Sequence, residues 1–162
     1  ARPCAKTVTG SPMPVTSCST CTRSITHCAG YRAAAVAEAT SLASIGIDAE
    51  PDEPLPDGVG ELVTLAEERT LLARLAAADP GVSWDRLLFS AKESIFKAWY
   101  PLTRRELDFT EARLDIDPPA GTFTAGILID GTRIDGGPPL TELRGRWLAA
   151  DDVLCTAVVV CN

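Results

Sequence analysis

The feature that most constrains the fold is a change of hydrophobic period near residue 105. Over residues 83–103, SWDRLLFSAKESIFKAWYPLT, apolar residues recur at the 3.6-residue spacing of an amphipathic helix. Ser83 can cap this helix, with Asp85 in its first turn. From residue 106 the period becomes two, in ARLDID, GTFTAGILID, LRGRWLAA and DVLCTAVVV. A long helix before four short strands predicts an α+β fold, with helices packed on antiparallel sheet.

The segments before this helix alternate between predicted strands and loops. Residues 1–23 are rich in Ser, Thr, Pro and Cys and read as irregular, whereas residues 24–39 predict a strand or a strand pair. The second half of that segment, YRAAAVAEA, also fits a helix. LASIGID, residues 42–48, predicts a strand, and the proline-rich residues 51–60 a loop. Residues 61–78, ELVTLAEERTLLARLAAA, predict one helix.

Charge and apolar run length exclude two classes of partner. The 162 residues include 15 lysines and arginines against 22 acidic residues, a formal net charge of −7. A nucleic-acid partner is not expected, because contacts to phosphates need a basic surface. No apolar run approaches the roughly 20 residues that span a bilayer, and ARPCAKTVTG at the N-terminus lacks the apolar core of a secretion signal. We therefore expect a cytoplasmic protein without a membrane partner.

Six cysteines leave two interpretations open. Cys155 and Cys161 lie in an apolar strand-like run, where a reduced cysteine packs as a small hydrophobe. The other four lie near the only histidine: Cys4, Cys18, Cys21, Cys28 and His27. Cys18 and Cys21 have the CxxC spacing of a zinc knuckle. However, His27 is adjacent to Cys28, and no second well-spaced pair of ligands follows. A structural zinc site and a set of unpaired thiols both remain as hypotheses.

Two carboxylates at the end of a predicted strand suggest a metal site. Asp48 and Glu50 are two residues apart, so in an extended strand they share a face, while Ile47 and Ala49 share the other. Like charges side by side repel, and a divalent cation such as Mg²⁺, which prefers oxygen ligands and substrate phosphates, removes that repulsion. The alternative is that the strand has already ended and both side chains are solvated.

The long helix adds one more acid and two bases. Glu93 and Lys97 are four residues apart and Lys92 adjoins Glu93, so we expect the three on one polar face, opposite the apolar stripe. The alternative is an ordinary surface ion pair, which contributes little to stability.

Three motifs in order resemble one family. FSAKESIFKAWYPLT resembles the signature helix of the Sfp-type 4′-phosphopantetheinyl transferases, an aromatic residue followed by S-x-K-E, three residues and K-A. IGIDAEP resembles the metal-binding strand of that family, and SITHCAGYRAAAV its histidine-bearing segment. The combination looks like the enterobactin synthetase component D-like subgroup of actinobacterial type.

This resemblance implies a single domain over residues 1–162 with two pseudo-related lobes. Each lobe would be an antiparallel sheet with a packed helix, and the active site would lie between them. The first lobe would cover about residues 24–80 and the second about 81–162. Residues 1–23 match the family poorly, so we expect the first lobe to be truncated or divergent at its N-terminus. A monomer is expected, because one chain supplies both lobes.

The resemblance also implies roles for particular residues. The expected ligands of Mg²⁺, or of Mn²⁺ in its place, are Asp48, the carbonyl group of Ala49, Glu50 and Glu93. The expected coenzyme A contacts are Thr26, His27, Lys92, Glu93 and Lys97, with the histidine toward the 3′-phosphate and the lysines toward the diphosphate. The expected catalytic residues are Glu93, Lys97 and Asp48, with the glutamate as general base for the acceptor hydroxyl.

The implied reaction is transfer of the phosphopantetheine arm of coenzyme A to a serine of an acyl or peptidyl carrier protein, with release of 3′,5′-ADP. Such carriers serve fatty acid, polyketide, nonribosomal peptide and siderophore assembly. The expected docking residues for an acidic carrier are Arg69, Arg74, Arg104 and Arg105, unless these are ordinary solvated side chains. Two alternatives remain: a weakened member that only binds coenzyme A or a carrier, and a zinc-binding interaction module.

Overall fold

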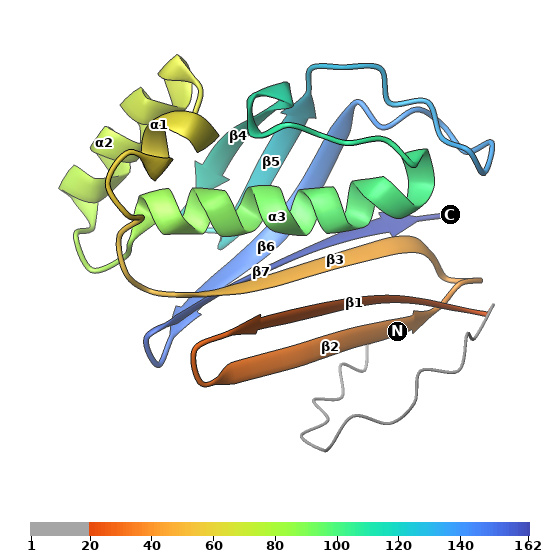
Figure 1. Cartoon of the computed structure of the whole chain (residues 1–162), viewed down its shortest axis with the longest axis horizontal. Helices are drawn as coiled ribbons and strands as arrows, with labels where there is room; N and C mark the ends of the chain where they lie inside the picture. The colour runs from red at the N-terminus through yellow and green to blue at the C-terminus, as the bar shows by residue number, and fades with distance from the viewer. Residues whose placement is uncertain (1–19) are drawn as a thin grey trace.

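A long helix lying across a five-stranded sheet forms the centre of the computed structural model, which describes residues 20–162 (Figure 1). The helix is α3, Trp84–Thr103. The sheet order is β3 (Leu42–Pro51), β7 (Val153–Cys161), β6 (Glu142–Ala150), β5 (Thr122–Ile127) and β4 (Ala112–Asp117). All four neighbouring pairs are antiparallel. The predicted helix, the four C-terminal strands and the α+β class are confirmed.

A separate two-stranded sheet lies beside β3. Its strands are β1 (Cys21–Cys28) and β2 (Tyr31–Glu38), an antiparallel hairpin whose turn includes Gly30 at φ 75°. Of the two interpretations for residues 31–38, the strand is therefore right and the helix wrong. Two side chains join the hairpin to the larger sheet: Ser24 Oγ accepts the Ile47 N–H at 3.0 Å, and Thr26 Oγ1 accepts the Ala49 N–H at 2.9 Å.

The single helix expected over residues 61–78 is two helices. They are α1 (Val59–Val63) and α2 (Ala66–Ala78). Thr64 and Leu65, both extended, separate the two helices. The start of α2 is capped by Glu68, whose carboxylate accepts the Leu65 N–H at 2.8 Å. A short 3-10 helix, η1 (Phe109–Glu111), precedes β4.

Close packing of α3 on β3 positions the site. The apolar stripe of α3 is fully buried, including Leu87, Ala91, Ile95 and Trp99 at 0% exposure. A large apolar side chain buried in this way contributes about 1.5–3 kcal/mol. The helix approaches β3 at Gly46, where an added Cβ would overlap the Ser94 carbonyl oxygen and lie 2.7 Å from the Ala98 nitrogen. Because glycine has no side chain, the backbone of α3 can approach β3 closely at Gly46. The polar side of α3 therefore lies against the residues that follow Gly46.

The larger sheet includes strands from both sides of residue 80. Residues 42–51 form β3, and β3 pairs along its length with β7 near the C-terminus. The two-lobe division thus remains a prediction, with β3 in the same sheet as the second-lobe strands. None of the helices formed by residues 20–162 is both long and apolar enough to cross a membrane. The predicted irregular segment 1–23 lies mostly outside the described residues, as do Cys4 and Cys18.

Candidate active site

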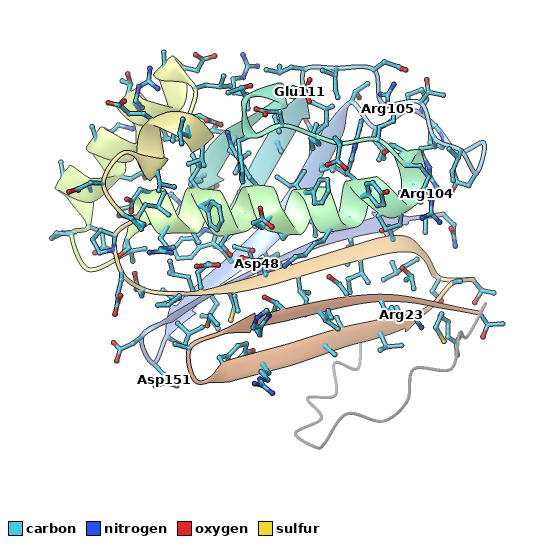
Figure 2. All side chains as sticks on the ribbon, in the orientation of Figure 1. Arg23, Asp48, Arg104, Arg105, Glu111 and Asp151 are labelled. Carbon is cyan, nitrogen blue, oxygen red and sulfur yellow. The ribbon has the colours of Figure 1, made fainter. Side chains whose placement is uncertain are left out.

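Asp48 lies at the centre of the site, and its side chain extends from β3 toward α3 (Figure 2). It is 5% exposed, and its Oδ1 accepts hydrogen bonds from Lys97 Nζ at 2.6 Å and from the Thr26 hydroxyl at 3.2 Å. These donors come from α3 and from β1. Asp48 therefore joins three elements that are far apart in the sequence.

The second oxygen of Asp48 is available to a ligand. Oδ2 is buried and has no hydrogen-bond partner among residues 20–162. A buried carboxylate oxygen without a donor is unfavourable, because it has lost its water without a replacement. This orphaned oxygen indicates a place for a positive group.

Glu50 points to the same side of β3 and is partly neutralised. Arg86, in the first turn of α3, donates to Glu50 Oε2 at 3.1 Å and to the main-chain carbonyls of Glu53 and Pro54. Burial raises the pKa of Glu50 and the charge of Asp48 raises it further, while Arg86 and Lys97 act in the opposite direction. The arginine thus holds the end of β3 against the start of α3.

Glu93, on α3, is close enough to Asp48 and Glu50 for their negative charges to act on its carboxyl group. Burial raises its pKa first, the negative charge of Asp48 raises it next, and the positive charge of Lys97 only partly offsets them. Lys97 favours the ionised form of Glu93, while burial and Asp48 oppose it, so a further positive charge nearby would favour the base role expected for Glu93. Asp48, Glu50 and Glu93 together carry more negative charge than Lys97 and Arg86 compensate.

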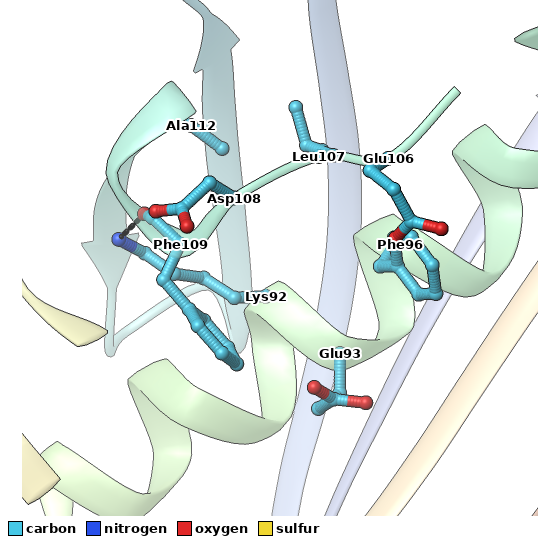
Figure 3. A pocket seen from close by; sticks show the side chains of 8 residues that line it. All are labelled: Lys92, Glu93, Phe96, Glu106, Leu107, Asp108, Phe109 and Ala112. Carbon is cyan, nitrogen blue, oxygen red and sulfur yellow. Dashed lines mark hydrogen bonds between the residues drawn. The ribbon is translucent and has the colours of Figure 1, made fainter. Parts of the chain in front are cut away.

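Lys92 does not join this cluster, and the single polar face expected for α3 is wrong in this respect. Its side chain is 3% exposed and points toward η1 (Figure 3). Its three ammonium protons are used by Glu68 Oε2 at 2.8 Å, the Val63 carbonyl at 2.9 Å and the Phe109 carbonyl at 2.6 Å. Lys92 is a structural residue in this arrangement, and we do not carry it into a coenzyme A site.

Thr26 and His27 point to opposite sides of β1. Thr26 is buried against β3, whereas His27 is exposed. The hairpin register sets His27 directly opposite Arg32, which is also exposed, so the two side chains share one face. Arg32 had no role in the sequence prediction, because only the strand register shows that it lies beside the histidine.

A cavity of about 180 Å³ lies next to Glu93 (Figure 3). It lies between α3 and the segment leading to β4, and its lining residues are Lys92, Glu93, Phe96, Glu106, Leu107, Asp108, Phe109 and Ala112. Stacking of Phe89 on Phe109, with ring centroids 5.5 Å apart, supports one wall. Glu93 is therefore one of the lining residues of a partly apolar cavity.

The carboxylates fit a divalent cation, but not as a complete ligand set. Among residues 20–162, no three His, Cys, Asp or Glu side chains are gathered closely enough to hold a metal by themselves. Mg²⁺ commonly binds one or two carboxylates and takes its other ligands from water and substrate phosphates. The unpaired oxygen of Asp48 and the unbalanced charge of Glu93 match that mode. The role expected for the Ala49 carbonyl remains a prediction.

The zinc hypothesis rests partly on residues outside the described part of the chain. Cys4 and Cys18 lie there, whereas Cys21, His27 and Cys28 are in β1. Burial is the main cause of a raised pKa for both Cys28 and Cys155, so these thiols favour the neutral form rather than the metal-binding thiolate.

Two of the four arginines considered for carrier docking already have partners within the chain. Arg105 pairs with Asp130 at 3.0 Å and Arg69 donates to the Thr64 carbonyl at 3.0 Å. Arg104 ends α3 near Arg105 (Figure 2), and Arg74 is exposed on α2. Their role in docking remains a prediction.

Two supporting residues escaped the sequence prediction. Arg86 acts on Glu50 across 36 positions, and Glu68 acts on Lys92 across 24. Neither separation is a helical or strand spacing, so no local pattern indicates them. The only available signal was the position of Glu68 three residues after Leu65, which is that of a capping-box glutamate.

Comparison with known proteins assigns these elements to one family. Residues 44–139, which contain most of β3 and all of α3, match the family model of the 4′-phosphopantetheinyl transferase superfamily. The chain is 60% identical over 137 residues to the 4′-phosphopantetheinyl transferase Svp of Streptomyces mobaraensis, covering 85% of this chain and 55% of the relative.

Two further relatives come from other genera. The 4′-phosphopantetheinyl transferase PptT of Mycobacterium tuberculosis is 45% identical over 141 residues, covering 85% of this chain and 61% of the relative. The 4′-phosphopantetheinyl transferase Npt of Nocardia iowensis is 48% identical over 142 residues, covering 83% of this chain and 63% of the relative. The chain thus spans between 55 and 63% of the length of the curated relatives described here.

Proposed function

Because the chain belongs to the 4′-phosphopantetheinyl transferase superfamily, we propose that it transfers the 4′-phosphopantetheine arm of coenzyme A to a serine of an acyl or peptidyl carrier protein. The observation that carries this proposal is the buried, unpaired Oδ2 of Asp48 beside Lys97 and Glu93. Such a site suits a substrate that brings a cation and phosphate oxygens together.

The proposed cation ligands are drawn from Asp48, Glu50 and Glu93, with the Ala49 carbonyl, and water and substrate phosphates supply the positions that these residues do not fill. Mg²⁺ bound there would neutralise the diphosphate of coenzyme A and hold it for attack. Lys97, whose side chain is 28% exposed, can turn from Asp48 toward a phosphate oxygen once the charge of Asp48 is otherwise balanced. Glu50 is held by its ion pair with Arg86 at 3.1 Å.

The proposed chemistry needs one proton transfer. Glu93 accepts the proton of the carrier serine hydroxyl, directly or through a water. The serine oxygen forms a bond to the β-phosphorus, the bond from that phosphorus to the bridging oxygen breaks, and 3′,5′-ADP leaves with the bridging oxygen. Lys97 neutralises charge on the diphosphate oxygens as the bond breaks.

Two surfaces suit the rest of coenzyme A. The Arg32 guanidinium and the imidazole of His27 lie side by side on the exposed face of the hairpin, where they can donate hydrogen bonds to the 3′-phosphate. The cavity beside Glu93, with its phenylalanine and leucine walls, suits part of the pantetheine arm. We place the reaction in the cytoplasm and expect a monomer, because one chain carries all the proposed ligands.

Release of 3′,5′-ADP tests this function. The chain is mixed with coenzyme A, Mg²⁺ and an apo carrier protein, and 3′,5′-ADP is measured by chromatography. We expect it in the complete mixture, and not with EDTA or with a carrier whose acceptor serine is replaced by alanine. Failure of the complete mixture with several carriers of each class would contradict the proposal, as would release that EDTA leaves unchanged.

A further inference from the structure

The hydroxyl of Thr26 is aimed at the carboxylate that we propose as a metal ligand. It accepts the Ala49 N–H at 2.9 Å and lies 3.2 Å from Asp48 Oδ1. A hydroxyl has one proton to donate. Because the main chain of β3 already occupies one of its acceptor positions, that proton is directed to Asp48.

Two donors on one oxygen decide which oxygen of Asp48 is free. Both Thr26 and Lys97 bind Oδ1, and the buried Oδ2 has no partner among the described residues. A carboxylate can turn about its terminal bond, which would swing the free oxygen away from its present direction. The donors oppose that rotation, so Oδ2 keeps its orientation.

The two donors differ in how firmly they are held. The Lys97 ammonium ends a long flexible side chain that is 28% exposed, and the proposed function also directs it to substrate. Thr26 is 7% exposed, has a short β-branched side chain and is tied to β3 through Ala49. Thr26 therefore remains in place when Lys97 moves.

We infer that Thr26 is a positioning residue for the metal site: its hydroxyl holds Asp48 with Oδ2 directed to a divalent cation. The inference rests on the proposed function, and it gives Thr26 a role other than the coenzyme A contact implied by the resemblance. Hydrogen bonds to ligating carboxylates orient them, and removing such a bond typically costs 10–100-fold in metal affinity.

Ser24 provides a matched control on the same strand. Its hydroxyl also accepts a main-chain N–H of β3, that of Ile47 at 3.0 Å, and Ser24 is 7% exposed. Among residues 20–162, Ser24 forms no hydrogen bond to a carboxylate. Ser24→Ala therefore removes the same kind of link between hairpin and sheet without touching Asp48.

Mn²⁺ binding to the chain without coenzyme A tests the inference directly. Free Mn²⁺ is measured by electron paramagnetic resonance while wild type, Thr26→Val, Thr26→Ser and Ser24→Ala are titrated. We expect Thr26→Val to weaken Mn²⁺ binding by about 10–100-fold. Thr26→Ser, which keeps the hydroxyl, and Ser24→Ala should stay within a few-fold of wild type.

Three results would overturn the inference. One is wild-type Mn²⁺ affinity in Thr26→Val with its fold intact by circular dichroism. Another is equal weakening in Thr26→Val and Ser24→Ala, which would show that the hairpin link alone matters. The third is no Mn²⁺ binding by the wild type.

The transfer assay separates this failure from failure of the proposed function. If Thr26 positions Asp48, Thr26→Val needs more Mg²⁺ for half-maximal 3′,5′-ADP release, and its KM for coenzyme A at saturating Mg²⁺ is unchanged. A raised KM for coenzyme A with normal Mg²⁺ dependence would return Thr26 to a substrate contact, while the transferase assignment would stand.

Discussion

At the scale of single residues, Glu93 carries the most specific role that we propose, that of general base. The sequence placed it beside a metal strand through motif resemblance, and the structure adds its burial and the charge of Asp48 as causes of its raised pKa. Lys92 shows what a sequence motif does not predict. It adjoins Glu93 in the motif, but its ammonium group contacts Glu68 and two main-chain carbonyls. A local pattern gives the direction of a side chain on its helix, not the partner that another element brings.

Replacing Glu93 with glutamine should remove transfer and preserve the fold. The amide keeps the shape but cannot accept the serine proton or balance a cation, so we expect kcat to fall by at least about 10²-fold, the lower limit for loss of a general base. Glu61→Gln on the exposed side of α1 is the control. Release of 3′,5′-ADP at a wild-type rate by Glu93→Gln would contradict the assigned role.

The ion pair between Arg133 and Asp135 gives a pH prediction. Arg133 is buried, donates two hydrogen bonds to Asp135 and lowers the pKa of this carboxyl to about 2. Because the folded pKa lies below the usual value of about 3.9, the pair stabilises the fold above pH 4, and this contribution disappears as pH falls toward 2.

Asp135→Asn should therefore lower the free energy of unfolding at pH 7 and make no difference near pH 2. The effect will be modest, because the Asp135 side chain is 41% exposed and water screens the pair. Urea unfolding followed at several pH values measures it. A difference between the two proteins that stays constant from pH 7 to pH 2 would argue against this pairing.

At the scale of elements, the contact between β3 and α3 decides whether the site exists. The sequence predicted both elements, since each has a strong period of its own. It could not predict that Gly46 meets Ser94 and Ala98, because contact across 48 positions depends on tertiary packing. It also missed the break at Thr64, where capping by Glu68 overrides the continuous helical pattern.

Gly46→Ala should separate these two elements. The added methyl meets helix backbone, which cannot give way as a side chain can, so we expect a loss of about 1–3 kcal/mol in stability and a larger loss of transfer. Gly60→Ala is the control, since nothing lies within 4 Å of a Cβ at that helical position. Equal stability and transfer in both variants would show that α3 does not pack on Gly46 as described.

The Glu68 to Lys92 pair should matter for stability rather than for coenzyme A. Glu68 is 1% exposed and also accepts the Leu114 N–H at 2.7 Å, so it joins α2, α3 and β4. Glu68→Ala leaves a buried ammonium unpaired and should cost about 3–5 kcal/mol. The neighbouring exposed position, in Glu67→Ala, should change little in urea unfolding.

The alternative role of Lys92 is tested by Lys92→Met. This variant should also lose stability, because it leaves Glu68 buried without its partner. A Lys92→Met protein with wild-type stability and a strongly raised KM for coenzyme A would instead make Lys92 a substrate contact.

At the scale of the whole molecule, the sequence predicted the α+β class and the order of elements, but not their grouping into sheets. Pairing of β3 with β7 joins residues about 110 positions apart, and no periodicity reports the partner of a strand. The hairpin lies beside β3 as a separate sheet and is joined to it through the side chains of Ser24 and Thr26. The proposed site is therefore formed where the hairpin, the larger sheet and α3 meet.

The most direct test of this account is the intact mass of an apo carrier protein after incubation with this chain, coenzyme A and Mg²⁺. We expect a gain of one phosphopantetheine arm on the acceptor serine, absent with EDTA and strongly reduced with Glu93→Gln. A carrier of unchanged mass with the folded wild-type chain, or a gain that persists unchanged in EDTA, would contradict a cation-dependent transferase site between β3 and α3.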